Sequence, residues 1–154
     1  MKNKNNMICI AASAGGHMTQ LLKLSDSWQG KDVFYVTTTE VLKEKLSQLG
    51  NVYVLGECNH QHPIRVIKVL CKCMQIIISQ RPKIIISTGA AAGCMLCFLG
   101  KLTGAKIVWI DSITNVEKLS LSGRMVRYIA DLFFVQWPHL QKKYNKVEYV
   151  GSVI

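Results

Sequence analysis

Acidic residues are scarce in this sequence and absent from its middle third. The 154 residues contain 9 Asp and Glu against 19 Lys and Arg, which gives a formal charge of +10. No acidic residue lies between Glu57 and Asp111, whereas seven basic residues fall there, so this basic window alone carries +7. Such a window fits an anionic membrane surface, a nucleic acid or a phosphate-bearing substrate.

The sequence also lacks a hydrophobic run long enough to cross a membrane. The longest apolar stretch, residues 84–99, is interrupted at Ser87, Thr88, Gly89 and Gly93, whereas a membrane-spanning helix needs about 20 consecutive apolar residues. No secretion signal is evident, because the first six residues are polar and the apolar run after them is short. We therefore expect a cytoplasmic chain that can touch a membrane without crossing it.

The six cysteines, at positions 9, 58, 71, 73, 94 and 97, form no convincing disulfide or metal pattern. Without export, free buried thiols are the usual state. Cys58-x-His60-x-His62 offers half of a metal site, but structural zinc needs about four ligands and no second pair is evident. We expect structural thiols and no metal, with a metal or redox role as the alternative.

The remaining composition predicts one α/β domain over residues 1–154. With 49% hydrophobic and 18% charged residues the chain is not disordered, and its length fits a single domain. Solid apolar blocks alternate with helical segments, which is typical of a Rossmann-like parallel sheet with helices on both faces. The predicted strands are residues 7–12, 32–38, 52–55, 83–87, 106–110, 132–135 and 147–150. The predicted helices are residues 17–28, 40–49, 64–80, 90–102 and 121–130.

Small and polar residues follow three of the predicted strands. They are Ser13, Ala14, Gly15, Gly16 and His17 after the first strand, Ser87, Thr88 and Gly89 after the fourth, and Asp111 and Ser112 after the fifth. Ligands of parallel sheets bind at the carboxyl ends of the strands, where helix N-termini favour anions. We therefore expect these residues to form a substrate site at one edge of the sheet.

The first of these loops does not match the common nucleotide-binding motifs. It is neither Gly-x-Gly-x-x-Gly nor a Walker loop, and no acidic residue follows the second strand. No resident cofactor is therefore expected. His17 is a candidate general base, with helix capping as the alternative. Asp111 either holds a substrate hydroxyl or caps the turn that follows it.

The predicted helix over residues 64–80 has a narrow polar stripe and a wide apolar surface. The stripe consists of Arg65, Lys68, Lys72, Gln75 and Ser79, which step by three and four residues. A wide apolar surface with a basic edge favours contact with an anionic membrane through Arg65, Lys68 and Lys72. The alternative is a buried crossover helix with a solvated basic edge.

Several short strings follow one another in an order known from one group of enzymes. They are Ser-Ala-Gly-Gly-His at 13–17, Ile-Ile-Ser-Thr-Gly at 85–89, Leu-Ser-Leu-Ser-Gly-Arg at 119–124, Ala-Asp-Leu-Phe at 130–133 and Val-Gln-Trp-Pro at 135–138. Over essentially its whole length the chain resembles the accessory, membrane-associating subunit of two-part glycosyltransferases. Such subunits include one half of the eukaryotic UDP-GlcNAc transferase that acts on dolichol-linked GlcNAc, and bacterial subunits of capsule and exopolysaccharide glycosyltransferases. A more distant resemblance is to the N-terminal half of the peptidoglycan GlcNAc transferase.

The resemblance implies a GT-B glycosyltransferase that is divided between two chains. This chain would be equivalent to the N-terminal, acceptor-facing domain, and a catalytic partner subunit would bind most of the UDP-sugar donor. The acceptor would be a polyprenyl-diphosphate saccharide. Gly15, Gly16 and His17 match the family's loop facing the cleft, and residues 87–89 match its second cleft loop.

The chain departs from the family pattern in two places. Asp111 stands where Glu is expected and Ala14 stands where Ser or Gly is commoner. We also expect no N-terminal membrane anchor of the kind that the eukaryotic relative has. No convincing site for the diphosphate of a sugar nucleotide is evident. We therefore expect the isolated chain to be nearly inactive, and to lie peripherally at the inner face of the membrane.

Two other functions remain open at the level of sequence. One is a self-sufficient small Rossmann-like enzyme that uses His17 and Asp111. The other is a basic nucleic-acid-binding module, although the basic residues are interleaved with aliphatic rather than aromatic side chains. We expect no nucleic-acid partner.

Overall fold

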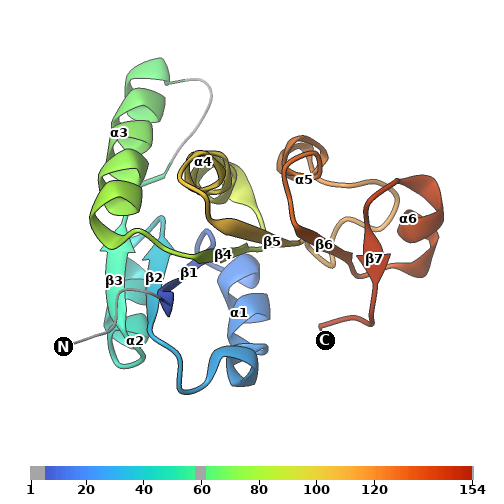
Figure 1. Ribbon diagram of the computed structural model, residues 1–154, viewed down its shortest axis with the longest axis horizontal. Helices are drawn as coiled ribbons and strands as arrows, with labels where there is room; N and C mark the ends of the chain where they lie inside the picture. The colour runs from blue at the N-terminus through green and yellow to red at the C-terminus, as the bar shows by residue number, and fades with distance from the viewer. Residues whose placement is uncertain (1–5, 58–61, 154) are drawn as a thin grey trace.

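Seven parallel strands form one sheet within residues 6–57 and 62–153, which this computed structural model describes. The strand order is β3-β2-β1-β4-β5-β6-β7 (Figure 1). The strands are β1 (Ile8–Ala11), β2 (Val33–Thr37), β3 (Asn51–Val54), β4 (Ile84–Ser87), β5 (Lys106–Ile110), β6 (Leu132–Val135) and β7 (Glu148–Tyr149). The predicted class, a Rossmann-like parallel sheet with helices on both faces, is confirmed.

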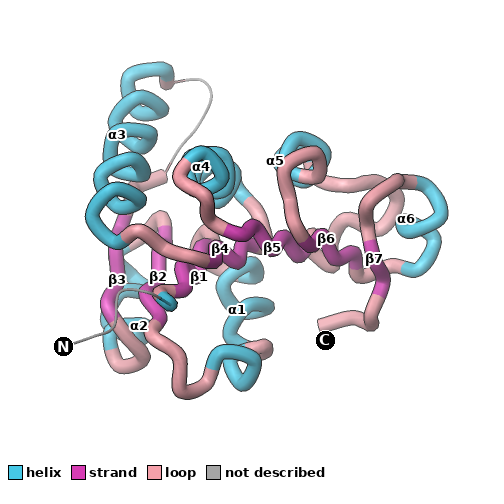
Figure 2. The backbone as a smooth tube through the Cα atoms, viewed as in Figure 1, coloured by secondary structure: helices cyan, strands magenta, loops and turns pink. Residues whose placement is uncertain are grey.

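Helices lie on both faces of the sheet. They are α1 (Gly16–Leu22), η2 (Ser25–Trp28), η3 (Glu40–Leu42), α2 (Lys43–Ser47), α3 (Pro63–Gln80), α4 (Ala90–Leu102), α5 (Leu121–Val126) and α6 (Pro138–Lys143). On one face α3 packs against α4 and α4 against α5, and we call these three helices the helical layer (Figure 2). Helices α1 and α2 lie on the opposite face (Figure 1).

Alternating side chains of the strands build two separate cores. Cys9, Phe34 and Ile85 belong to the core beneath the helical layer, together with the fully buried Trp109. Ile10 and Tyr35 point to the other face and pack with residues of α1 and η2. Because both faces of the central strands are buried, their sequence is continuously apolar rather than alternating.

A small residue lets α4 approach the sheet closely. A Cβ atom placed on Gly93 would lie 2.3 Å from the Ser87 Oγ at the end of β4. Any larger residue would push the helix away from the strand, because packed interiors leave no room for an added atom. The small residues of this helix therefore fix the N-terminus of α4 next to the carboxyl edge of the sheet.

Several predicted element boundaries are wrong. The expected helix over 17–28 is divided into α1 and η2, because the Leu24 amide bonds to the Leu21 carbonyl in a tighter turn before the short polar residues of η2. The expected helix over 40–49 likewise begins as η3, and the last strand is only β7. Helix α6 was not predicted. It starts at Pro138, whose fixed φ suits the first helical turn.

An exposed ion-pair cluster joins the start of β5 to α4 and to the start of β6. Asp131 accepts bonds from Lys101 Nζ at 2.7 Å, Lys106 Nζ at 3.1 Å and the Ile107 amide at 2.8 Å. Partial burial raises the pKa of the Asp131 carboxyl, but these bonds lower it more, so its pKa falls from 3.8 to about 2. The ionised carboxylate therefore stabilises the fold above pH 4, and this contribution is lost as the pH falls towards 2.

We predict that Asp131→Asn lowers the free energy of unfolding at pH 7 by about 1–2 kcal/mol. The difference from the parent chain should shrink between pH 4 and pH 2, where the parent carboxylate takes up its proton. Urea unfolding over this pH range measures both effects. Glu40→Gln is the control, because Glu40 forms only an exposed pair with Lys43. An unchanged stability at pH 7 would contradict the role of this cluster.

Candidate functional site

The candidate site lies where the strand order reverses, between β1 and β4. The chain leaves β1 for α1 on one face and leaves β4 for α4 on the other (Figure 1). In open parallel sheets such a reversal creates the ligand-binding crevice at the carboxyl edge. His17 in α1 and Thr88 after β4 meet there. Thr88 Oγ1 donates to the His17 carbonyl at 3.0 Å, and His17 Nδ1 lies 3.1 Å from the Thr88 carbonyl. This reciprocal pair joins the two predicted loops.

The bond to Thr88 determines which nitrogen of His17 is free. A carbonyl oxygen only accepts hydrogen bonds, so Nδ1 must carry the hydrogen. In the neutral ring Nε2 then keeps its lone pair, and His17 is only partly buried. The side chain is thus held in the tautomer that a general base requires.

A cleft of about 240 Å³ opens at the same edge of the sheet, but neither His17 nor Thr88 lines it. It is lined by Ser13, Ala14, Thr38, Glu57, Ala90, Ala91 and Ala92. The first turn of α4 has no acidic residue, and Gly89 before it provides no capping side chain. Free amides at a helix N-terminus favour a negatively charged group such as a phosphate. Sequence reasoning found Ser13 and Ala14 but missed Thr38, whose Oγ1 accepts the Ala14 amide at 3.3 Å.

The other predicted site residues fall into an exposed group and a buried group. Gly15 and Gly16 are exposed at the tip of the first loop, whereas Ser87, Thr88 and Gly89 are buried behind the cleft. Ser87 Oγ accepts the Gly89 amide at 3.3 Å. The second loop therefore supports the cleft from behind, and only the first presents much of its backbone to solvent.

Asp111 is buried, and its carboxylate is occupied by protein donors. Its side chain accepts bonds from Trp109 Nε1 at 3.1 Å, Asn115 Nδ2 at 3.2 Å, the Ser120 amide at 3.0 Å and Ser120 Oγ at 2.7 Å. A Cβ atom on Gly123 would lie 2.6 Å from Asp111 Oδ1. The geometry supports the second of the two roles considered for Asp111, which is to organise the turn that follows it. Contact with a substrate hydroxyl stays a prediction.

A buried pair of glutamines lies beneath Ser112, and sequence reasoning assigned it no role. Gln136 Nε2 donates to Gln20 Oε1 at 2.7 Å and to the Asp111 carbonyl at 3.0 Å. Gln20 Nε2 donates to Ser112 Oγ at 3.3 Å, and Gln136 Oε1 accepts the Val153 amide at 2.8 Å. The only signal was the Val-Gln-Trp-Pro string that contains Gln136. This network joins α1, the ends of β5 and β6, and the C-terminal segment.

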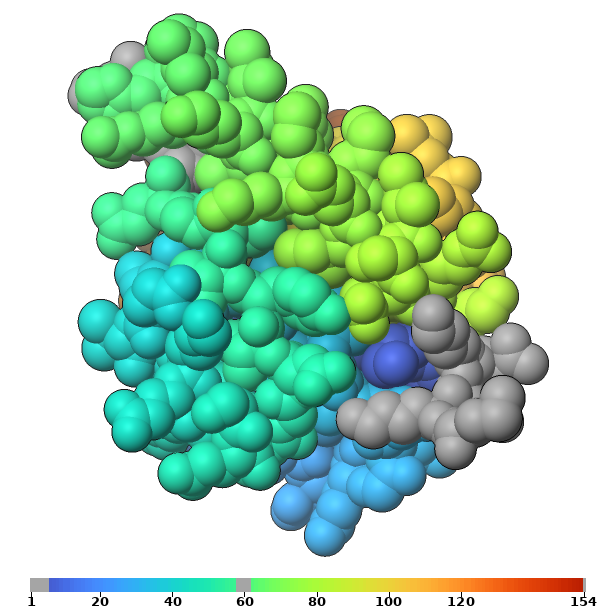
Figure 3. All heavy atoms as spheres, turned by 90° about the vertical axis from the view of Figure 1, so that its left-hand side faces the viewer, coloured from blue at the N-terminus to red at the C-terminus, as the bar shows by residue number. Residues whose placement is uncertain are grey.

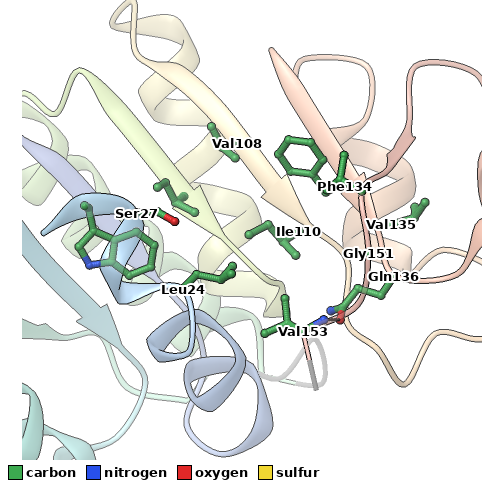
Figure 4. A pocket seen from close by; sticks show the side chains of 12 residues that line it. Leu24, Ser27, Val108, Ile110, Phe134, Val135, Gln136, Gly151 and Val153 are labelled. Atoms are coloured by element: carbon green, nitrogen blue, oxygen red, sulfur yellow. Dashed lines mark hydrogen bonds between the residues drawn. The ribbon is translucent and has the colours of Figure 1, made fainter.

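An apolar groove of about 260 Å³ lies on the sheet face opposite the helical layer. Ile86, Val108 and Phe134 line it from β4, β5 and β6, and all three are only partly buried. Figure 4 shows Val108 and Ile110 on β5, with Leu24 and Val153 nearby. Its walls come from residues 24–28 and from the C-terminal residues 150–153. At the groove, part of this face of the sheet is therefore not covered by other elements.

The surface of α3 differs from that of a buried crossover helix. Only Val69, Cys73, Ile76 and Ile77 are buried. Five large apolar side chains are exposed along it: Ile64, Ile67, Leu70, Met74 and Ile78. The N-terminal half of α3 projects beyond the body of the molecule (Figure 3). Among residues 6–57 and 62–153, no helix combines the length and hydrophobicity that crossing a membrane requires.

The predicted basic residues of α3 line a hollow beside the end of β3. Arg65, Lys68 and Lys72 share it with Glu57, and Lys72 Nζ donates to the Leu55 carbonyl at 3.1 Å. Their stripe adjoins the exposed apolar stripe of the same helix. Whether they contact a membrane stays a prediction.

The thiols of this chain are mostly buried. Cys9, Cys73, Cys94 and Cys97 lie inside, and Cys71 is exposed. Burial raises the pKa of the Cys9, Cys94 and Cys97 thiols, so these are unreactive at neutral pH. Within the described parts of the chain no group of three or more His, Cys, Asp or Glu residues could hold a metal ion. Cys58 and His60 of the possible half-site lie outside the described residues.

We predict that Asp111→Asn lowers the free energy of unfolding by about 2–3 kcal/mol, because the new NH2 group would face hydrogen-bond donors where one carboxylate oxygen now accepts, while its Oδ1 could still accept at the other. Chemical denaturation measures the change, and Asp26→Asn is the control because Asp26 is exposed. A variant that keeps full stability but loses substrate binding would instead show that Asp111 holds the substrate.

Comparison with known proteins identifies relatives of this chain. Residues 39–153 match the family described as "Oligosaccharide biosynthesis protein Alg14 like". The "UDP-N-acetylglucosamine transferase subunit ALG14" of Homo sapiens is 26% identical over 96% of this chain and 82% of its own length. The protein of the same name from Candida albicans is 40% identical over 51% of this chain and 38% of its own length.

Solved structures show the same fold at low sequence identity. MurG of Acinetobacter baumannii superimposes with a TM-score of 0.76 and 14% identity over 96% of this chain. The UDP-GlcNAc 2-epimerase of Methanocaldococcus jannaschii gives a TM-score of 0.68 and 11% identity over 95% of this chain. This chain spans less than half, 45%, of each of these two proteins. With the matched region covering most of its length, the chain belongs to the Alg14-like family of oligosaccharide biosynthesis proteins.

Proposed function

We propose that this chain is the non-autonomous, acceptor-side subunit of a membrane-associated glycosyltransferase. A catalytic partner subunit supplies the domain that grips the UDP-sugar. The observation that carries the proposal is the match, over 96% of this chain, to a relative named as a subunit of a UDP-N-acetylglucosamine transferase. A subunit implies a second chain, and the binding of the UDP-sugar is assigned to that partner.

The proposed chemistry places His17 next to the acceptor. The free Nε2 takes the proton from an acceptor hydroxyl, whose oxygen then attacks the anomeric carbon of the sugar while the bond to UDP breaks. Ser13, Ala14, Gly15 and Gly16 contact the acceptor from the first loop, and the second loop holds His17 through Thr88. The α4 N-terminus suits the diphosphate of the acceptor.

The acceptor that we propose is a polyprenyl-diphosphate saccharide. The diphosphate fits the basic window and the lipid chain fits a site close to a membrane. A precursor of a capsule or exopolysaccharide is the acceptor class that the likeness to bacterial subunits implies. Membership in a family of oligosaccharide biosynthesis proteins supports an acceptor that already carries sugar.

The apolar groove is the surface that we propose for the partner subunit. Its lining from β4, β5 and β6 belongs to strands that a parallel sheet normally buries on both faces. An amphipathic segment of the partner would complete this cover and remove the apolar area from water.

Helix α3 is the proposed membrane contact, at the inner face of a cytoplasmic membrane. Its five exposed apolar side chains enter the lipid boundary, and Arg65, Lys68 and Lys72 face anionic head groups. Each basic residue contributes about 1 kcal/mol near an anionic surface, so the attachment is reversible.

We predict that the isolated chain transfers no sugar, and that coexpression with a chain supplying a UDP-sugar-binding domain restores transfer. The assay follows labelled sugar from UDP-GlcNAc onto a polyprenyl-diphosphate GlcNAc acceptor.

Val108→Asp in the groove should weaken copurification of the partner at least about tenfold, because it buries an unpaired charge. Val41→Ser is the matched control, since Val41 is 86% exposed in η3.

Two results would contradict these assignments. Strong transfer by the isolated chain would exclude the division of the enzyme into two chains and favour a self-sufficient enzyme. Full copurification of the partner by a folded Val108→Asp variant would exclude the groove as its binding surface.

We predict that His17→Asn lowers the transfer rate of the assembled complex by about 10²–10⁴-fold without changing its thermal stability. The Asn amide can still donate to the Thr88 carbonyl in place of Nδ1, but it provides nothing at the position of Nε2. Steady-state rates and unfolding temperature measure the two effects, and exposed His139→Asn is the control. Full activity of the His17→Asn variant would assign His17 a purely structural role.

A further inference from the structure

Helix α5 exposes a second apolar stripe that the proposed function leaves unused. Leu121 is 70% exposed, Met125 is 51% exposed, and Tyr128, just beyond the helix end, is 71% exposed. Their spacing of four and three residues places them on one side of a helical turn. Because water disfavours such a cluster, it indicates an interaction surface rather than an ordinary exposed helix.

This stripe belongs to the same layer as α3. Helix α4 packs against both α3 and α5, and all three lie on one side of the sheet (Figures 1 and 2). Helix α4 adds Phe98 and the 84% exposed Leu102 to the outer apolar surface. Exposed apolar side chains therefore recur on each of the three helices.

Acidic residues are unevenly divided between the helices of the two faces. None of the three helices of the layer contains an acidic residue, whereas each contains at least one Lys or Arg. The opposite face carries Asp26 in η2, Glu40 in η3 and Glu44 in α2, together with the basic Lys43 and Lys45 of α2. Lys101 of α4 is engaged with Asp131, but Arg124 of α5 is exposed. The three helices thus combine basic and apolar side chains and contain no acidic residue, although Glu57 shares the hollow of the α3 basic residues and Asp131 pairs with Lys101.

We infer that the whole helical layer, with Leu121, Met125 and Tyr128 of the α5 region as a second insertion point, is the surface that lies on an anionic lipid bilayer. This inference rests on the proposed membrane attachment and extends it from one helix to three. A bilayer suits the separate apolar stripes with basic residues between them, because lipid adapts to an uneven surface. A protein partner would instead favour a formed groove, such as the one on the opposite face.

A second insertion point would fix the orientation of the protein on the membrane. Helix α5 starts directly after Ser120, whose amide and hydroxyl bond to Asp111. The helix is thus rigidly tied to the end of β5, at the edge that carries the cleft. One contact would leave the molecule free to rotate about α3, whereas two hold the cleft at a constant height above the lipid.

Vesicle cosedimentation of the full chain tests this inference. The vesicles contain phosphatidylcholine alone or mixed with phosphatidylglycerol. Leu121→Ser with Met125→Ser forms the α5 variant, and Ile64→Ser with Ile67→Ser forms the α3 variant. Val41→Ser with Leu49→Ser is the control, because these exposed residues lie outside the layer. All six positions are exposed, so each variant should fold, which its unfolding temperature verifies.

We expect the α5 and α3 variants each to bind mixed vesicles roughly tenfold more weakly, and the control to bind like the parent chain. A tryptophan introduced by Tyr128→Trp should also be quenched by brominated lipid beyond the level of the parent chain. Weaker binding by the α3 variant alone, without this quenching, would overturn the inference but leave the proposed attachment intact. Unchanged binding by both variants would overturn both.

A third result would assign α5 to the partner subunit. If the α5 variant binds vesicles normally but loses copurification of the partner, the stripe is a protein interface and the inference is wrong.

Discussion

The buried carboxylate of Asp111 is the constraint on which the geometry of the functional edge depends. A carboxyl group in the interior is costly to bury unless hydrogen bonds satisfy it, and Asp111 accepts four hydrogen bonds. Those donors come from β5, from the crossover after it and from Ser120 at the start of α5. The same group therefore closes the loop after β5 and positions the helix that completes the helical layer. Replacement of any donor would leave part of the carboxylate unsatisfied inside the protein.

The glutamine pair extends this constraint to the other side of the sheet. Gln136 bonds to the Asp111 carbonyl, to Gln20 one turn beyond His17, and to the Val153 amide. Gln136, Gly151 and Val153 also line the apolar groove. One buried residue, Gln136, thus connects the surface proposed for the partner with the end of β5 and with the helix that bears His17. Hydrogen bonds are strong in such a low-dielectric interior. A shift of the C-terminal segment would therefore be transmitted through Gln136 to the residues beside the cleft.

The sequence was sufficient to predict the strands and the two loops of the crevice, because solid apolar blocks and glycines are local signals. The Asp111 and Gln136 networks were not predictable in this way. Gln20 and Gln136 are 116 positions apart, and no local sequence pattern predicts their hydrogen bond. The α3 surface was ambiguous for another reason. Its buried and exposed faces carry the same aliphatic types, so periodicity alone cannot tell Ile67, which is exposed, from Ile77, which is buried. Which of the two side chains is buried depends on the position of α3 at the margin of the helical layer, and the sequence does not give this position.

The two faces of the sheet are therefore built for different purposes under the proposed function. One face is covered by α3, α4 and α5, and the outer surface of that cover carries apolar and basic side chains. The other face is covered only in part and keeps a groove under β4, β5 and β6. Because the sheet separates them, membrane and partner do not compete for the same surface and can be bound together. The cleft opens at the carboxyl edge between the two faces. A lipid-linked acceptor reaching it from the membrane side and a UDP-sugar held by the partner on the other side would then meet at His17.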